Sequence, residues 1–401
     1  MVRIPRLYQQ ILTDHLSRHR QMAFVAGPRQ VGKTTTCRSS SRDARYLDWD
    51  DQDHRRLILK GPAAVAAEFG VEQLSEQPTV LVLDELHKYA RWKTFLKGLH
   101  DRYSDRMQVL VTGSSRLDVY RRGGDSLMGR YLLYRMHPLS VGELLRQGLA
   151  TGNVANPKRL SPARFRALWE HGGFPEPFSK KDVRFSRQWR RLRRAQLLRE
   201  DIRDTTRIQE LDQLDVLAAM LEELSGGQVV YSSFARDINV SVDTVRRWIG
   251  ALVSLHHGFL VRPWFRNVKK SLRKEPKWYL RDWSGIRDPG RRAETFVACH
   301  LLKAVETWTD LGIGEFELRH LRDKEKREVD LVVIRDGEPW FLVEVKQRDV
   351  ALSPQLRHFQ EQTGAPHAFQ VVVELDYVDA DPFSRTDPCV VAARTLLSQL
   401  P

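Results

Sequence analysis

The stretch Gly27-Pro28-Arg29-Gln30-Val31-Gly32-Lys33-Thr34 fills every fixed position of the phosphate-binding pattern G-x-x-x-x-G-K-[S/T]. An apolar run, Met22–Ala26, precedes it, and a stretch compatible with a helix, Thr34–Ser39, follows it. In such a strand–loop–helix, glycines let backbone N–H groups turn toward phosphates, and the helix N-terminus adds positive potential. We therefore predict an ATP-binding loop, with Lys33 on the β- and γ-phosphates and the Thr34 hydroxyl on Mg²⁺. The residues expected to contact the nucleotide are Gly27, Pro28, Arg29, Gln30, Val31, Gly32, Lys33, Thr34 and Thr35.

Two acids, Asp84 and Glu85, end the apolar run Thr79–Leu83. Two carboxylates at a strand tip cost free energy unless a cation or a hydrogen-bond donor meets them. Beside a phosphate loop, Asp84 would hold the Mg²⁺ shell, and Glu85 would orient and deprotonate the attacking water. Taken alone, the same pattern is that of a strand leaving the core. With the loop, it favours a nucleotide-hydrolysing enzyme, in which Lys33 and Glu85 are the catalytic residues.

A third apolar run, Gln108–Val111, is followed by the hydroxyl residues Ser114 and Ser115. Ser114 is predicted to touch the γ-phosphate or the lytic water, and helix capping is an equally good interpretation. Arg130 is predicted to act as an arginine finger on the nucleotide of a neighbouring subunit, which requires a homo-oligomer such as a ring. An ordinary surface arginine is the alternative for this position.

The composition bounds the class of protein. The chain has 401 residues, 41% of them hydrophobic, and at roughly 150 residues per domain this length indicates two or three domains. Lys and Arg total 65 against 51 for Asp and Glu, so the net charge is +14. That charge favours a polyanionic partner, nucleic acid before a membrane surface, over a basic surface with no specific partner.

Cysteine usage and hydropathy point to a compartment. Cys37, Cys299 and Cys389 lie far apart in the chain, which suits a reducing cytoplasm rather than a disulfide framework. No apolar run approaches the roughly 20 residues of a membrane span. The expectation is a cytoplasmic protein with no membrane partner.

The middle of the chain has the pattern of a DNA-reading module. Ser232–Asn239 is predicted to be a short helix, and Val242–Leu252 a second helix with Arg246 and Arg247 on its open face. Two strand-like pieces follow, Gly258–Trp264 and Pro276–Leu280. The residues predicted to contact DNA are Arg246 and Arg247 on the helix and, on the basic wing between the strands, Lys269, Lys270, Arg273 and Lys274. A lid that packs on the nucleotide domain and binds no DNA is the alternative.

The last segment contains a candidate metal-dependent nuclease site. Arg327–Ile334 and Trp340–Lys346 are predicted to form a hairpin that brings Asp330 close to Glu344 and Lys346. The two carboxylates would hold Mg²⁺ or Mn²⁺, and Lys346 would position or activate the water. Glu294, on a predicted helix, could add a further acid. The alternative is an exposed hairpin with alternating charges and no catalytic role. Nuclease-like folds often keep their shape and lose their catalytic activity.

The chain resembles bacterial and archaeal ATP-binding proteins that carry an AAA-type ATPase domain followed by a C-terminal domain of unknown function. The residues that carry the resemblance are Gly27–Thr34, Leu81–His87, Thr112–Ser115, Gly129-Arg130, His137–Ser140 with Glu143, Gly172–Glu176, Arg199–Arg207 and Lys277–Asp282. The resemblance implies a P-loop ATPase, a winged-helix segment and a tail similar to restriction-endonuclease-like, PD-(D/E)xK, folds. His87 departs from the order of polar residues that the group often has after the acid pair.

These observations predict an α/β protein of three domains. Residues 1–147 would form an AAA-type ATPase domain with a parallel sheet, residues 159–285 a helical lid plus winged helix, and residues 286–401 a restriction-endonuclease-like α/β domain. The predicted function is ATP hydrolysis coupled to action on DNA, with metal-dependent processing of branched or damaged DNA as one use of the tail. The alternative is an ATP-gated switch whose tail binds a protein partner and cuts nothing.

Overall fold

The computed structural model describes residues 4–73, 75, 77–113, 127–146, 148–149, 152–202, 208, 210–265 and 275–401. The chain divides into two compact units. The N-terminal unit consists of residues 2–137 and 147–149, and the C-terminal unit of residues 138–146 and 150–401. The predicted middle and C-terminal domains thus belong to one compact unit.

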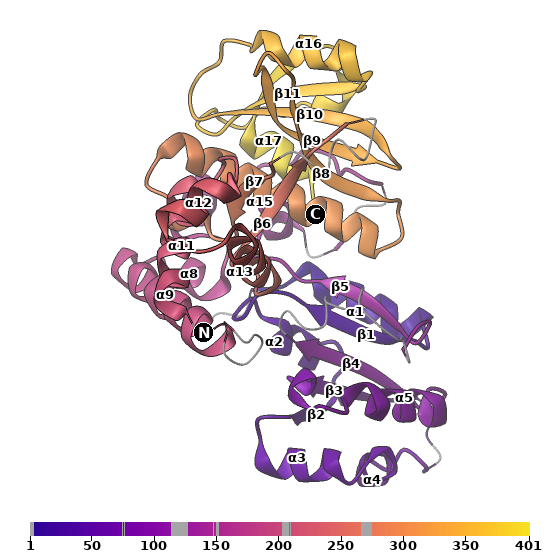
Figure 1. Ribbon diagram of the computed structural model, residues 1–401. Helices are drawn as coiled ribbons and strands as arrows, with labels where there is room; N and C mark the ends of the chain where they lie inside the picture. The colour runs from indigo at the N-terminus through magenta and orange to yellow at the C-terminus, as the bar shows by residue number, and fades with distance from the viewer. Residues whose placement is uncertain are drawn as a thin grey trace. The chain divides into compact units, whose positions relative to one another are not determined.

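The described strands of the N-terminal unit form a five-stranded sheet in the order β2-β3-β4-β1-β5, and neighbouring strands pair in parallel. The strand β4 lies between β1, which leads into the phosphate loop, and β3, which ends at the acid pair. The tips of all three strands therefore meet at one edge of the sheet (Figure 1). The elements are α1 Leu7–Arg18, β1 Met22–Ala26, α2 Lys33–Arg38, β2 Arg45–Asp48, α3 Gln52–Leu59, α4 Pro62–Glu68, β3 Thr79–Asp84, η1 Leu86–Lys88, α5 Trp92–Tyr103, β4 Met107–Gly113 and β5 Tyr131–Arg135.

The C-terminal unit begins with helices and ends with a mixed sheet and its covering helices. Its elements are α6 Val141–Leu145, α7 Pro162–His171, α8 Pro175–Lys180, α9 Val183–Gln196, η3 Leu197–Asp201, α11 Leu211–Leu224, α12 Tyr231–Asp237, α13 Val242–Ser254, β6 Gly258–Pro263, β7 Lys277–Leu280, η4 Trp283–Gly285, α15 Pro289–Asp310, β8 Phe316–Arg322, β9 Glu328–Arg335, β10 Glu338–Lys346, α16 Pro354–Thr363, β11 His367–Val372, η5 Pro382–Ser384, β12 Cys389–Ala392 and α17 Ala393–Gln399.

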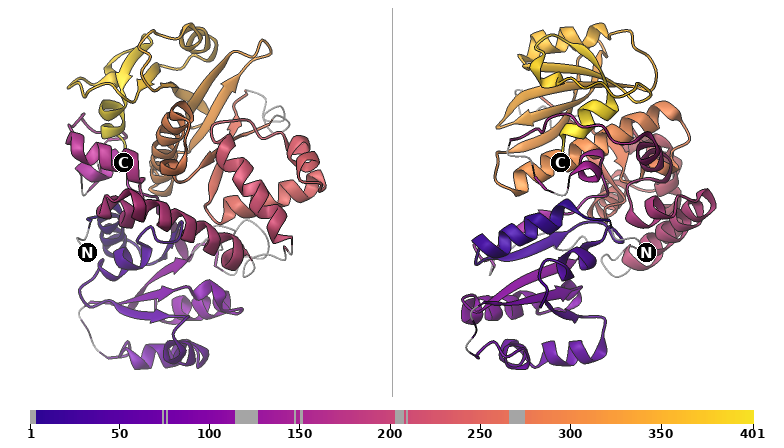
Figure 2. Two further views of the ribbon diagram at one scale, coloured as in Figure 1. Left: turned by 90° about the vertical axis from the view of Figure 1, so that its left-hand side faces the viewer. Right: turned by 180° about the vertical axis from the view of Figure 1, so that it is seen from behind.

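One sheet joins the predicted wing strands to the predicted nuclease hairpin. The described strands have the order β12-β11-β10-β9-β8-β6-β7, and α15 packs along this sheet (Figure 2). Arg262 and Pro263 of β6 pair in parallel with Arg319 and His320 of β8. The expected boundary between residues 285 and 286 therefore falls within a single sheet, because strand pairing, which no local pattern announces, links the two segments.

Residues 138–146, predicted to close the ATPase domain, belong to the C-terminal unit, where a buried ion pair holds them. Ser140 caps α6, and the carboxylate of Glu143 lies 2.5 Å from the ammonium of Lys303 on α15. The Lys303 ammonium also donates to the Ser140 hydroxyl at 2.9 Å. Both charged side chains are almost fully buried, so each charge stabilises the other there.

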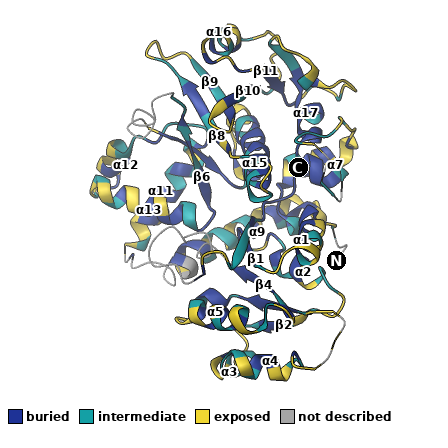
Figure 3. Cartoon of the chain, turned by 90° about the vertical axis from the view of Figure 1, so that its right-hand side faces the viewer, coloured by how far each residue is buried: buried dark blue, intermediate teal, exposed yellow. Residues whose placement is uncertain are grey.

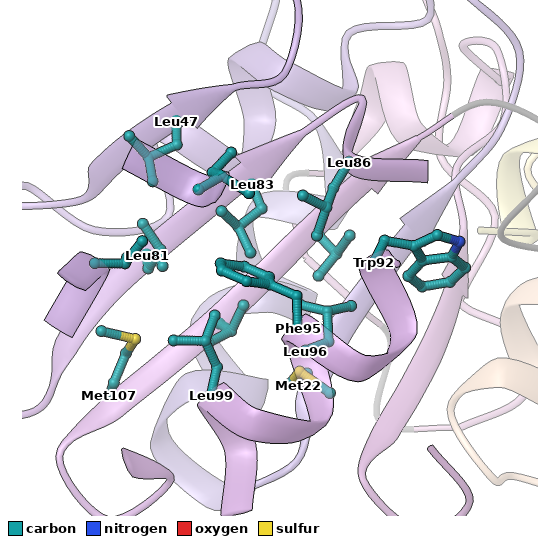
Figure 4. Packing of buried hydrophobic residues seen from close by; sticks show 14 of the residues in the cluster. Met22, Leu47, Leu81, Leu83, Leu86, Trp92, Phe95, Leu96, Leu99 and Met107 are labelled. Carbon is teal, nitrogen blue, oxygen red and sulfur yellow. The ribbon is translucent and has the colours of Figure 1, made fainter. Parts of the chain in front are cut away.

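Burial follows the layering of each unit. Figure 3 shows buried residues along the strands and exposed residues on α3, α4 and α12. In the N-terminal unit, Phe95, Leu96 and Leu99 of α5 pack against Leu81 and Leu83 of β3, as Figure 4 shows. Among the described helices, none combines the length and the apolar character that a bilayer crossing requires.

Candidate functional site

The phosphate loop has the backbone that its glycines predict. Gly27 and Gly32 have φ angles of 152° and 101°, and Gln30, at 62°, is also in the left-handed region. A Cβ atom at Gly27 would lie 2.2 Å from the carbonyl oxygen of Met136, beyond the end of β5. Position 27 thus admits only glycine unless the adjacent backbone moves.

Lys33, the first residue of α2, folds back onto its own loop. Its ammonium donates hydrogen bonds to the carbonyl oxygens of Gly27 and Pro28, both at 2.9 Å. Burial lowers the pKa of Lys33 to about 8, although Glu85 and Asp84 act to raise it. The ammonium is therefore held at the centre of the loop, where the phosphates of a nucleotide are predicted to lie.

Asp84 receives donors from the two neighbouring strands β2 and β4, from the loop helix and from the next residue along the chain. Its carboxylate accepts hydrogen bonds from the hydroxyls of Thr34 at 2.6 Å and Tyr46 at 3.0 Å, and from Thr112 of β4. The backbone N–H of Glu85 also donates to it, at 3.1 Å. The contact between Asp84 and Thr34 places a carboxylate and a hydroxyl together, which are the hard oxygen donors that Mg²⁺ prefers. These two residues therefore fit the predicted magnesium site.

Glu85 is turned toward the loop by a left-handed backbone conformation, with φ at 51°. One of its carboxylate oxygens lies 3.6 Å from the Lys88 ammonium and 3.7 Å from a ring nitrogen of His87. That oxygen is buried and accepts no hydrogen bond from the described residues. Burial raises the pKa of Glu85, partly opposed by Lys88 and Lys33. A carboxylate with a raised pKa and an oxygen that can still accept a hydrogen bond is suited to act as a general base toward water.

Arg6 supports the loop, a role that the sequence did not predict. Its buried guanidinium donates to the carbonyl oxygens of Val31 in the loop and of His137 after β5, the second bond at 2.6 Å. An arginine near the start of a chain carries no local signal for such a role. The structure shows that the loop is anchored from 25 residues upstream.

We expect Arg6→Met to lower the free energy of unfolding of the N-terminal unit by about 1–3 kcal/mol, because it leaves two buried carbonyls without their donor. The looser loop should also bind ATP more weakly. Thermal melting with and without ATP measures both effects. Arg18→Met on the exposed end of α1 is the matched control. Equal melting temperatures of the two variants would contradict the anchoring role.

Two predicted nucleotide contacts have different outcomes. Ser114 lies outside the described residues. Arg130 forms a two-pronged ion pair with Asp101 at the end of α5, with nitrogen–oxygen distances of 2.7 and 3.2 Å. Its guanidinium is thus engaged within its own chain, and a role on a neighbouring subunit stays a prediction that requires this pair to open.

The predicted DNA contacts are described only in part. Arg246 and Arg247 are exposed on α13, and Figure 3 shows other exposed residues on this helix and on α12. Arg246 also pairs with Asp243 at 3.4 Å, and this carboxylate partly offsets the positive charge of the arginine. The wing residues Lys269, Lys270, Arg273 and Lys274 lie outside the described part of the chain.

The predicted tail residues do lie together. Lys346 donates to the carboxylate of Glu344 at 2.8 Å, and one oxygen of Asp330 accepts from the backbone N–H of Val345 at 2.9 Å. Burial and the neighbouring Asp330 raise the pKa of Glu344. A further residue, Lys277 of β7, reaches into this group, and the sequence indicated it only as part of the resemblance.

Lys277 lies among three acids of the C-terminal unit. Its ammonium lies 3.0 Å from Glu294 and 3.4 Å from Asp330, and also pairs with Glu328. Burial acts to lower the pKa of Lys277, but Tyr279 and the surrounding carboxylates raise it well above its usual value. Within the described ranges, no three His, Cys, Asp or Glu side chains are gathered to hold a metal ion. The binding of a divalent metal by Asp330 and Glu344 stays a prediction.

Comparison with known proteins divides the chain into three matched stretches. Residues 19–145 match the family described as AAA domain, and this stretch contains the loop, Asp84 and Glu85 in the geometry described above. The N-terminal unit is an AAA-type ATPase domain. After the ATPase domain, residues 162–287 and 289–381 match two families described as domains of unknown function, DUF8612 and DUF4143.

The curated relatives add little about purpose. The uncharacterized proteins Rv2008c of Mycobacterium tuberculosis and Mb2031c of Mycobacterium bovis are each 25% identical over 261 residues, covering 65% of this chain and 54% of theirs. The chain thus spans about half the length of these curated relatives. Among solved structures, the Walker-type ATPase PABY2304 of Pyrococcus abyssi has a TM-score of 0.42 at 14% identity, covering 68% of this chain and 92% of that one. The Aeropyrum pernix ORC1 protein in complex with DNA has a TM-score of 0.30 at 14% identity, covering 72% and 91%.

Proposed function

We propose that this protein uses its ATPase domain to drive an action on DNA. The observation that supports ATP hydrolysis is the contact between Thr34 at the start of the loop helix and Asp84 at the tip of β3, where Glu85 follows. The DNA half rests on the net charge of +14 and on the exposed arginines of α13. The cytoplasmic location and the DNA partner are parts of this proposal.

Hydrolysis would use four side chains of the ATPase domain. Lys33 would exchange its loop carbonyls for phosphate oxygens and offset their charge. Thr34 and Asp84 would hold Mg²⁺, which when bound neutralises charge on the phosphates. Glu85 would orient water with its buried oxygen and take the proton that the water loses on attack. Asp84 is already hydrogen-bonded by Tyr46 and Thr112, so its orientation is fixed before the nucleotide binds.

DNA contact would centre on α13. The helix follows α12 after a short turn, and the antiparallel strands β6 and β7 come next. This order supports the predicted winged helix, with α13 as the reading helix and residues 266–274 as the wing. Val245, Trp248 and Ile249 of α13 are buried, which leaves Arg246 and Arg247 to face a phosphate backbone.

We expect duplex, single-stranded or branched DNA to raise the ATPase rate, and the form that acts best identifies the substrate class. The double variant Arg246→Ala/Arg247→Ala should weaken DNA binding and flatten its salt dependence, by about one unit of slope for each phosphate that the variant no longer neutralises. Arg357→Ala, an exposed arginine on α16, is the control of equal charge change per residue. Unchanged binding in the double variant, or no response of the ATPase to any DNA, would favour the alternative of an ATP-gated switch for a protein partner.

Self-association belongs to the same proposal. In a homo-oligomer, including a ring, Arg130 of one subunit would act on the nucleotide of the next after leaving Asp101. Metal-dependent cleavage by Asp330, Glu344 and Lys346 is not included, because the Lys277 ammonium already pairs with Asp330 and the neighbouring Glu328.

A further inference from the structure

We propose that Lys277 takes the place of a divalent cation in the tail, so that the tail binds no catalytic metal and its carboxylates instead fix β7 to the sheet. This inference concerns the C-terminal unit alone and stands apart from the ATPase.

The ammonium of Lys277 has as many N–H donors as there are carboxylates around it. An ammonium has three N–H donors, and three carboxylates surround this one: Glu294 of α15 and Glu328 and Asp330 of β9. The Lys277 side chain is only 4% exposed. A buried ammonium with this set of partners is stable where it lies, and removing it would leave three acids close together.

The carboxylate oxygens are also occupied by other donors of the chain. Glu294 accepts a second hydrogen bond, at 2.6 Å, from the hydroxyl of Tyr279. The other oxygen of Asp330 accepts from Val345, and one oxygen of Glu344 accepts from Lys346. The second oxygen of Glu344 is buried and accepts no hydrogen bond from the described residues. A hard cation needs several such oxygens together, and one does not suffice.

Lys277 reaches these acids from a different segment than the hairpin that carries them. It begins β7, directly after the predicted wing, and β7 pairs with β6 alone among the described strands of the sheet. The ion cluster thus attaches β7 to α15 and β9 directly, in addition to the pairing of β7 with β6. By this geometry Lys277 is a positioning residue, which holds the strand that leads out of the wing against α15 and β9.

The test uses the full chain without nucleotide, in an Asp84→Asn background that removes the magnesium ligand of the ATPase domain. Mn²⁺ binding is followed by electron paramagnetic resonance and stability by thermal melting. With Lys277 present, we expect no saturable Mn²⁺ binding and no change in Tm. With Lys277→Met added, the Tm should fall by roughly 6–20 °C, and Mn²⁺ should bind saturably and restore much of the loss.

Two further variants keep the outcome decisive. Lys346→Met removes a neighbouring ammonium that contacts only Glu344 among the hydrogen bonds described, and should gain no Mn²⁺ site. Lys277→Arg keeps the charge, should fold, and should bind no Mn²⁺. Saturable Mn²⁺ binding with Lys277 in place, abolished by Asp330→Asn, would overturn the proposal even if Lys277→Met failed to fold. So would a Lys277→Met protein of unchanged Tm.

Discussion

Glu85→Gln should retain ATP binding and lose turnover by about a hundredfold or more, since loss of one charged group at a transition state commonly costs several kcal/mol. An amide cannot take the proton from the attacking water. It has nearly the size of the carboxylate, so the loop and Lys33 should keep their geometry. Steady-state phosphate release and binding of a fluorescent ATP analogue separate turnover from affinity.

Two further variants are needed to interpret the result for Glu85→Gln. Lys33→Ala should weaken both nucleotide binding and turnover, because the ammonium is proposed to contact phosphate before and during the reaction. Glu68→Gln changes an exposed acid on α4 and should leave both unchanged. Normal turnover in Glu85→Gln would remove the assignment of Glu85 as the base.

Glu143→Ala should lower the free energy of unfolding of the C-terminal unit by about 3–5 kcal/mol, because it leaves the Lys303 ammonium buried without its counter-charge. The Ser140 hydroxyl remains as a partner, but a neutral oxygen does not replace a carboxylate. The double variant Glu143→Leu/Lys303→Met, which removes both charges, should recover most of the loss.

Urea denaturation of the full chain measures this effect. Two compact units allow two transitions, so separate probes are needed for each unit. Glu361→Gln on the exposed face of α16 controls for the loss of a surface acid. A shift of less than about 1 kcal/mol in Glu143→Ala would show that the buried pair contributes no more than a surface pair.

Features that are local in sequence were predictable. The strand before the loop was expected over Met22–Ala26 and is observed there, and the helix of Val242–Leu252 is observed as Val242–Ser254. Periodicity and glycine placement within about ten residues determine such elements. Asp84 and Glu85 were predictable because a strand places whatever follows it at the sheet edge.

Features that depend on distant partners were not predictable. Arg6 binds His137, 131 residues away, and Lys277 meets Asp330 after 53 residues. A single basic residue gives no sign of which acid or carbonyl it will meet. The pairing of β6 with β8 likewise joins segments that are more than 50 residues apart in the chain. Local sequence patterns do not show this pairing, and the predicted boundary between residues 285 and 286 lies inside one sheet.

The shared sheet limits how the protein can be dissected. A fragment that starts at residue 286 would contain the tail hairpin and α15 but would lack β6 and Lys277. Its strand β8 would present an unpaired edge, which invites aggregation, and Glu294, Glu328 and Asp330 would repel one another. The matched stretches 162–287 and 289–381 thus describe two modules of sequence that share one folded sheet. We expect truncations made at their border to be less stable, because they remove the pairing of β6 with β8 and the ion pairs of Lys277.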